Sequence, residues 1–235
     1  MGTPPSSFSV KHKVGRRRIA MLDRKTYKLM KKKYGGVGSW AVWCPQTDKN
    51  APKSNMGNMD WTKDEDGLCS VLNPEFVFVG LNLSDSHGKY SDAKTPWVNF
   101  HSGNPHGNSF KLRFALKDTS FWGAYMTDLI KGVKETDSKK VVSKLKKDSA
   151  LLEHNMKEFE REISHFGGKP VLVALGKAVG KFLKPLELEG KYVVKELPHY
   201  SSRINKEQYR AEVSKTIGKY INKTSVPTVG RMRRK

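Results

Sequence analysis

The chain contains four short segments rich in apolar residues, three of which lead directly into polar loops. They lie at residues 76–80, 122–127, 170–175 and 192–197. Apolar runs of this length are typical of strands that are buried in the centre of a sheet. A further run at 39–44, which holds two tryptophans, also predicts a strand.

Between these segments the apolar residues take helical spacing. Five of them follow one another at intervals of four, three, four and three: Leu152, Met156, Phe159, Ile163 and Phe166. This spacing predicts one amphipathic helix over 138–166. Helices are also predicted at 22–34, 108–117, 176–183 and 206–222. Because strands alternate with helices, we expect an α/β protein, a three-layer α/β/α fold around a mainly parallel four-stranded sheet.

Composition divides the chain into three parts. Residues 1–38 are expected to form a basic N-terminal arm with a short helix, since prolines, serines and three consecutive arginines precede the helical pattern. Residues 39–223 are expected to form the α/β domain, with an irregular loop at 46–70. Residues 224–235 are a basic C-terminal tail.

The net charge points to the class of partner. The 44 lysines and arginines exceed the 23 acidic residues by 21, which favours nucleic acid as the partner over an anionic membrane or a general effect on solubility. The two cysteines are too few for a four-cysteine metal site. No apolar run approaches the length of a membrane span, and no signal-peptide pattern is found. We therefore expect a cytoplasmic monomer that binds DNA and needs neither a membrane nor a cofactor.

Polar side chains follow three of the predicted strands. They are Asn82, Asp128 and His199, and a parallel sheet would gather them at the carboxyl ends of its strands. Each also has an ordinary structural interpretation, as an Asx-turn residue, a helix cap and a surface-loop histidine. Hydrolysis of an N-glycosidic bond would use them differently. Asn82 would hold a water, His199 would stabilise the departing base, and Asp128 would hydrogen-bond the base edge while Trp97 or Phe100 stacks on it.

Three motifs carry a resemblance to a known family. VGLNLSDSHG (79–88), AYMTDLIKG (124–132) and LPHYSSRIN (197–205) resemble, in this order, the motifs of the uracil-DNA glycosylase superfamily, nearest to its mismatch-specific and single-strand-selective branches. The segment 170–183 is similar to the strand-glycine-helix that lies between the last two. The resemblance covers about 76–222.

The resemblance implies a role for each matching residue. Asn82 and His199 become the catalytic pair, and Asp128 and Gly80 contact the base. Contacts to DNA would come from Ser84, Ser201, Ser202, Arg203 and Lys131, with Arg203 entering the base stack. The implied activity is monofunctional excision of uracil or a related damaged base, as in base excision repair. No metal or organic cofactor is required.

Three residues depart from the family pattern. Leu83 and Tyr200 stand where the family has proline, and Asp128 stands where it has asparagine. An ionised carboxylate can only accept hydrogen bonds, so it cannot donate to the O4 atom of uracil. Two alternatives therefore stay open: a catalytically inactive DNA-binding protein of the same fold, and a hydrolase that acts on nucleotides or RNA.

Overall fold

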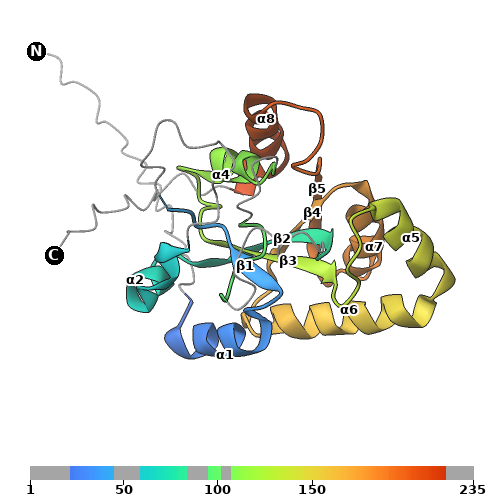
Figure 1. The fold of residues 1–235 in the computed structure, drawn as a ribbon, viewed down its shortest axis with the longest axis horizontal. Coiled ribbons are helices and arrows are strands. Elements are labelled where there is room, and N and C mark those ends of the chain that lie inside the picture. Colours follow the sequence, from blue (N-terminus) through green and yellow to red (C-terminus); the bar gives the residue numbers. More distant parts are fainter. Residues whose placement is uncertain (1–21, 45–58, 84–94, 102–106, 221–235) are drawn as a thin grey trace, which may run out of the picture.

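A computed structural model describes residues 22–44, 59–83, 95–101 and 107–220 (Figure 1). Its centre is a five-stranded mixed sheet, ordered β1-β3-β2-β4-β5. The strands are β1 (Gly38–Trp40), β2 (Asn73–Asn82), β3 (Ala124–Ile130), β4 (Val171–Leu175) and β5 (Val193–Leu197). The expected α/β class is confirmed, but the sheet has five strands rather than four. The additional strand is β1, which pairs antiparallel with β3 at the edge, whereas the other four strands are parallel.

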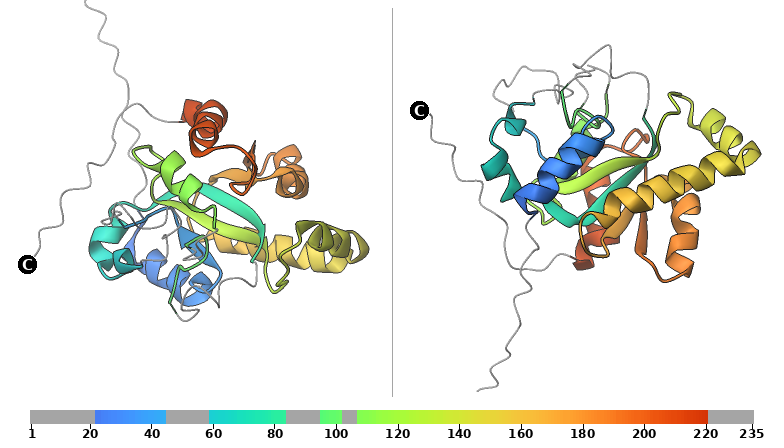
Figure 2. Two further views of the ribbon diagram at one scale, coloured as in Figure 1. Left: turned by 45° about the horizontal axis from the view of Figure 1, so that its top comes forward. Right: turned by 90° about the horizontal axis from the view of Figure 1, so that it is seen from below.

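Helices pack on both faces of the sheet, because alternate residues of β2 point to opposite sides. Val77 and Val79 face a core shared with α1 (Arg24–Tyr34), α5 (Ser138–Lys147), α6 (Ser149–Ser164) and α7 (Lys177–Leu188), which we call the α6 face. Phe76 and Phe78 face a core shared with α4 (Phe110–Leu116) and α8 (Lys206–Ile217), the α8 face. Seen from below, α1 and α6 lie in front of the strands (Figure 2).

The order of the strands creates a switch point at β2. The chain leaves β2 through α4 to reach β3 on one side, and then crosses back over β2 through α5 and α6 to reach β4 on the other. In open α/β sheets of this kind, ligands bind beyond the carboxyl ends of the strands at the point where the strand order reverses. The carboxyl ends of β2 and β4 are therefore the place to look for a site.

The helix predicted over 138–166 is two helices. Asp148 ends α5 and begins α6, with φ of −126° and ψ of 83°. Its side chain accepts a hydrogen bond from the Leu151 backbone at 2.9 Å, which satisfies one of the free N–H groups of the new helix. The α5 helix turns Val141 and Leu145 inward, and α6 turns Phe159 and Ile163 inward.

The N-terminal helix predicted at 22–34 is confirmed as α1. Asp23 caps it by accepting from the backbone N–H of Thr26 at 2.9 Å, and Tyr27 and Met30 are fully buried in the core of the α6 face. Short helices, η1 (Asp60–Thr62) and α2 (Glu65–Cys69), occupy part of the stretch expected to be irregular.

The remaining predicted helices and strands are found within a few residues of their expected limits. The last helix is α8, which is followed by the short helix η2 (Gly218–Tyr220). In the described part of the chain, no helix combines the length and the apolar character needed to cross a membrane.

Candidate functional site

The register of the parallel strands brings the predicted site residues to one edge of the sheet. Gly80 of β2 lies opposite Asp128 of β3. The pairs Val79–Ala174 and Leu175–Leu197 continue the same level through β4 to β5. Asn82 and His199 each lie two residues beyond this level. Since neighbouring strands are about 4.8 Å apart, the backbones of β2 and β5 are separated by roughly 10 Å.

Gly80 leaves room for the carboxyl group of Asp128. A Cβ atom at Gly80 would lie 2.2 Å from Asp128 Oδ1 and 3.2 Å from Cζ of Phe100. The three residues are therefore in contact on the α8 face, as expected for groups that contact one ligand. Any side chain at position 80 would displace the carboxyl group of Asp128. This steric conflict explains why the position is occupied by glycine.

Asp128 is a buried acid, with 5% of its surface exposed. Its Oδ2 accepts a hydrogen bond from Nδ2 of Asn99 at 2.8 Å. Burial raises the pKa of Asp128 to about 6, although the Asn99 hydrogen bond and the charge of Lys131 both act to lower it. Within the described parts of the chain, Oδ1 accepts no hydrogen bond.

The rings of Phe100 and Tyr200 lie near this acid, and the ring of His199 follows them. The rings of Phe100 and Tyr200 meet edge to face with centroids 6.3 Å apart, and Tyr200 stacks on His199 with centroids 4.2 Å apart. Phe100 is buried and has a φ of 63°, a left-handed conformation that is uncommon for an aromatic residue. Phe100 is thus in the position predicted for it, beside Gly80 and Asp128.

His199 is held as a neutral imidazole in one tautomer. The backbone N–H of Ser201 donates to its Nδ1 at 3.2 Å, and the Ser201 hydroxyl lies 2.6 Å from the same atom. Since a backbone N–H can only donate, Nδ1 is an acceptor and the proton is on Nε2. Burial lowers the pKa of His199 to about 4. The ring therefore presents a neutral N–H donor at ordinary pH.

A buried lysine of α4 holds the loop that follows His199. Lys111 of α4 is 7% exposed, and its ammonium donates to the carbonyl oxygen of Ser202 at 2.8 Å. The N–H of Ser202 in turn donates to the carbonyl of His199 at 2.8 Å. Ser201 and Arg203 are exposed on the outside of this loop, so both are accessible to a partner.

Asn82 has its amide nitrogen committed to the backbone. Nδ2 donates to the carbonyl oxygens of Glu135 at 2.7 Å and Val133 at 3.0 Å. This assigns the nitrogen side of the amide, and leaves Oδ1 as an acceptor without a hydrogen bond from the described residues. The free oxygen is the atom that was expected to hold a water.

Two of the predicted site residues lie elsewhere. Trp97 is fully buried on the α6 face, where its Nε1 donates to the Tyr27 hydroxyl at 3.1 Å and its ring meets Trp40. It is on the opposite side of the sheet from Asp128, so its predicted role in base stacking is wrong.

Lys131 points inward as well. Its ammonium lies 2.5 Å from Oε2 of the fully buried Glu162 and donates to the carbonyl of Asp128 at 2.9 Å. Only 18% of its side chain is exposed, so a contact with phosphate would compete with a buried ion pair. Ser84 lies outside the described residues.

Three residues of the site were missed by the sequence interpretation. Asn99 binds Asp128, Lys111 holds the loop after His199, and Tyr200 supplies a ring between His199 and Phe100. Tyr200 could have been found, because an aromatic residue directly follows the candidate histidine. The other two are brought in by contacts between distant parts of the chain, for which the sequence carries no local signal.

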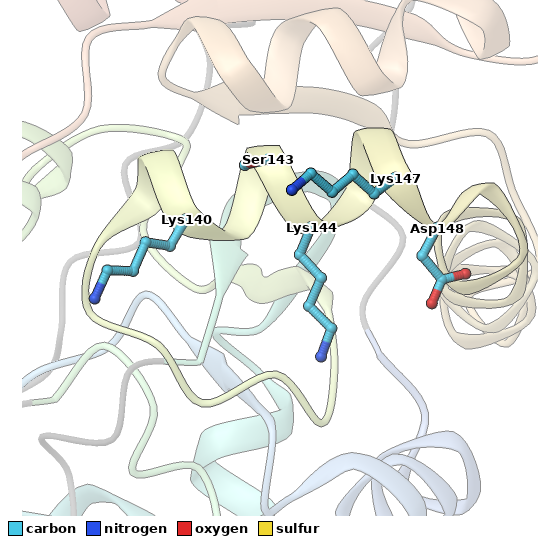
Figure 3. Close-up of a pocket in the computed structure, with 5 residues that line it drawn as sticks. All are labelled: Lys140, Ser143, Lys144, Lys147 and Asp148. Atoms are coloured by element: carbon cyan, nitrogen blue, oxygen red, sulfur yellow. The ribbon is translucent and has the colours of Figure 1, made fainter.

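A basic surface begins near Asn82. Glu135, which binds the Asn82 amide, lies two residues before Asp137, the N-cap of α5. The α5 helix contains no acidic residue and exposes five lysines: Lys139, Lys140, Lys144, Lys146 and Lys147. Lys140, Lys144 and Lys147 surround a surface hollow of about 370 Å³ with Ser143 and Asp148 (Figure 3). This arrangement is suited to an extended anion.

Comparisons with known proteins leave the chain without an assigned family. No family model, no curated protein and no solved structure matches it. Among the described residues, no group of three or more His, Cys, Asp or Glu side chains could hold a metal ion.

Proposed function

We propose that this protein is a DNA glycosylase that hydrolyses the N-glycosidic bond of uracil or a related deaminated base. The observation that carries the proposal is that a hydrogen-bond acceptor and a hydrogen-bond donor both lie at the carboxyl edge of the sheet. Asn82 offers an amide oxygen that accepts no hydrogen bond from the described residues, and His199 offers a neutral N–H donor. Asp128 and Phe100 lie against Gly80, two residues before Asn82 on β2. The three sequence motifs that resemble the uracil-DNA glycosylase superfamily contain three of these four residues.

The chemistry divides between the two ends of the site. The base leaves as an anion, so a neutral donor at His199 Nε2 stabilises the charge that develops in the transition state. The oxygen of Asn82 orients a water toward C1′ of the sugar but cannot take its proton, which makes this a modest contribution. Asp128 hydrogen-bonds the edge of the flipped base and Phe100 contacts its ring.

The fold proposed with this function is a three-layer α/β/α arrangement like that of uracil-DNA glycosylases. Helices on both faces of a sheet with four parallel strands support it. The antiparallel strand β1 adds an edge to that arrangement without reaching the site.

A gel assay of base release tests the function. Oligonucleotides carry one uracil, either single-stranded or opposite G or A, and alkali cleaves the chain wherever the base has been released. We expect release by the wild type. We expect a rate about 100-fold lower for Asn82→Ala, because the water loses its oriented acceptor, with DNA affinity and melting temperature measured beside it. Equal rates for both proteins would show that Asn82 holds no water.

The lysines of α5 are proposed to contact the DNA backbone next to the site. Replacing Lys140, Lys144 and Lys147 by glutamine should weaken DNA binding and lower the slope of log affinity against log salt by about two to three. The matched control replaces Lys25, Lys28 and Lys32 of α1, at the other end of the molecule (Figure 1). Equal slopes for the two triple variants would exclude α5 as a specific contact surface.

A second candidate function is DNA binding without base release. Tyr200 favours it, because its ring lies against His199 and Phe100, where a base would have to enter. Salt-dependent DNA binding combined with no release from a panel of uracil, hypoxanthine and xanthine substrates would select this candidate. Release from a nucleoside monophosphate, without preference for DNA, would select a nucleotide hydrolase instead.

A further inference from the structure

Asn99 fixes which oxygen of Asp128 can carry a proton. The N–H of Phe100 donates to Asn99 Oδ1 at 3.0 Å, and Asn99 Nδ2 donates to the carbonyl of Val37 at 2.7 Å. These two contacts define the nitrogen and oxygen sides of the amide. The second N–H of Nδ2 then donates to Asp128 Oδ2 at 2.8 Å, so Oδ2 is an acceptor in either state of the acid. A proton on Asp128 is therefore favoured on Oδ1, because a carbonyl oxygen accepts more strongly than a hydroxyl oxygen.

Oδ1 is also the oxygen directed at the candidate base site. It lies over the Cα atom of Gly80, where an added Cβ would approach it to 2.2 Å. Only 5% of the surface of Asp128 is exposed, so the acid is largely withdrawn from water. Oδ1 makes no hydrogen bond to the described residues, so it is available to a ligand at this edge of the sheet.

The charged and titratable groups around the acid leave both of its states accessible near neutral pH. Lys131, the residue after β3, lies at the Asp128 carbonyl and favours the carboxylate, while Glu162 of α6 opposes it. Tyr200, from the loop after β5, lies near enough for its own pKa to be raised by Asp128 in addition to burial. Burial outweighs the favourable contacts, and the pKa of Asp128 is raised to about 6.

We propose that Asp128 recognises its base as a neutral carboxylic acid, donating from Oδ1 to a ring carbonyl oxygen. This proposal rests on the proposed glycosylase function and assigns the group that reads the base. A carbonyl oxygen at that position accepts the hydrogen bond, whereas the amino group of the undamaged parent base is itself a donor and is rejected. The class is therefore bases in which deamination has replaced an amine by a carbonyl.

The asparagine variant provides the matched comparison. In Asp128→Asn, the Asn99 N–H still requires an acceptor, so the amide oxygen occupies the place of Oδ2 and the amide N–H2 that of Oδ1. The variant thus offers the same donor as the neutral acid but does not titrate. His199, with a pKa of about 4, stays neutral above pH 5 and adds no titration of its own.

The experiment measures single-turnover release of uracil and of hypoxanthine between pH 5 and pH 8, with cytosine and adenine as parent controls. We expect the wild-type rate to fall about 100-fold across this range as the acid ionises. The rate of Asp128→Asn should stay constant, so that at pH 8 the variant is the faster enzyme. Melting temperature is recorded for both proteins from pH 4 to pH 8. Because the pKa of Asp128 is raised from 3.8 to about 6, the wild type should lose stability relative to the variant between pH 4 and pH 7.

Other outcomes separate this proposal from the function on which it rests. A wild-type rate that rises with pH, together with a slow variant, would mean that the carboxylate is the active form and would overturn the neutral-acid proposal alone. The same holds if both proteins release uracil with equal, pH-independent rates. Release of no base by either protein would overturn the glycosylase function, and this proposal with it.

Discussion

Replacing His199 by alanine is expected to slow uracil release by roughly 10³-fold, the loss that follows removal of one preorganised donor at a developing negative charge. DNA affinity should change little, because the imidazole faces its own loop and the neighbouring ring of Tyr200. The measurement is single-turnover release under saturating enzyme, with the affinity for an undamaged duplex determined separately.

The protonation state of His199 sharpens this prediction. Burial lowers its pKa from 6.5 to about 4, so the histidine binds a proton in the folded protein only at strongly acidic pH. Wild-type release should therefore show no loss from His199 ionisation above pH 5. His154, exposed on α6, provides the control: His154→Ala should release uracil at the wild-type rate. If His199→Ala did the same, the histidine would have only a structural role.

The strands and most helices could be predicted because their signals are local. Apolar runs mark β2 and β4, and residues at helical spacing mark α6. The division of α5 from α6 also has a local cause, the capping side chain of Asp148. The continuous apolar spacing obscured it, since each half keeps its own buried side. The parallel topology also predicted that Asn82, Asp128 and His199 lie near one another in level, at the carboxyl ends of their strands.

The choice between Trp97 and Phe100 could not be made from the sequence. The two residues are three apart, both have positive φ, and both are buried. Their segment is not a regular strand or helix, so no periodicity tells which side of the sheet each one faces. The side of the sheet that each residue faces is set by its tertiary contacts. Trp97 donates to Tyr27, and Phe100 lies over Gly80.

The groups that support the site depend on contacts across long stretches of chain. Asn99 and Asp128 are 29 residues apart, and Lys111 and Ser202 are 91 apart. A lysine in a helix ordinarily indicates a solvated position, which is the opposite of what Lys111 does. Such residues become identifiable only once the tertiary packing is known.

Replacing Lys131 by methionine is expected to lower the free energy of unfolding by about 3–5 kcal/mol, a cost typical of breaking a buried ion pair. Glu162 is fully buried and would lose its cation, while Oε1 still accepts from the hydroxyls of Tyr125 at 2.6 Å and Thr127 at 2.9 Å. Urea unfolding measures the change. Lys139→Met, on the exposed surface of α5, should stay within about 0.5 kcal/mol of the wild type.

The same variant decides whether Lys131 binds phosphate. If its ammonium belongs to Glu162, the salt dependence of DNA binding should be unchanged in Lys131→Met, and adding Glu162→Gln should restore part of the lost stability, since the second substitution removes the unpaired charge. A lysine in contact with DNA would give the opposite pair of results, near wild-type stability and a salt slope lower by about one. Lys131 also donates to the backbone carbonyl of Asp128. Any effect of Lys131→Met on base release should therefore come from a change in the position of Asp128, and not from weaker DNA binding.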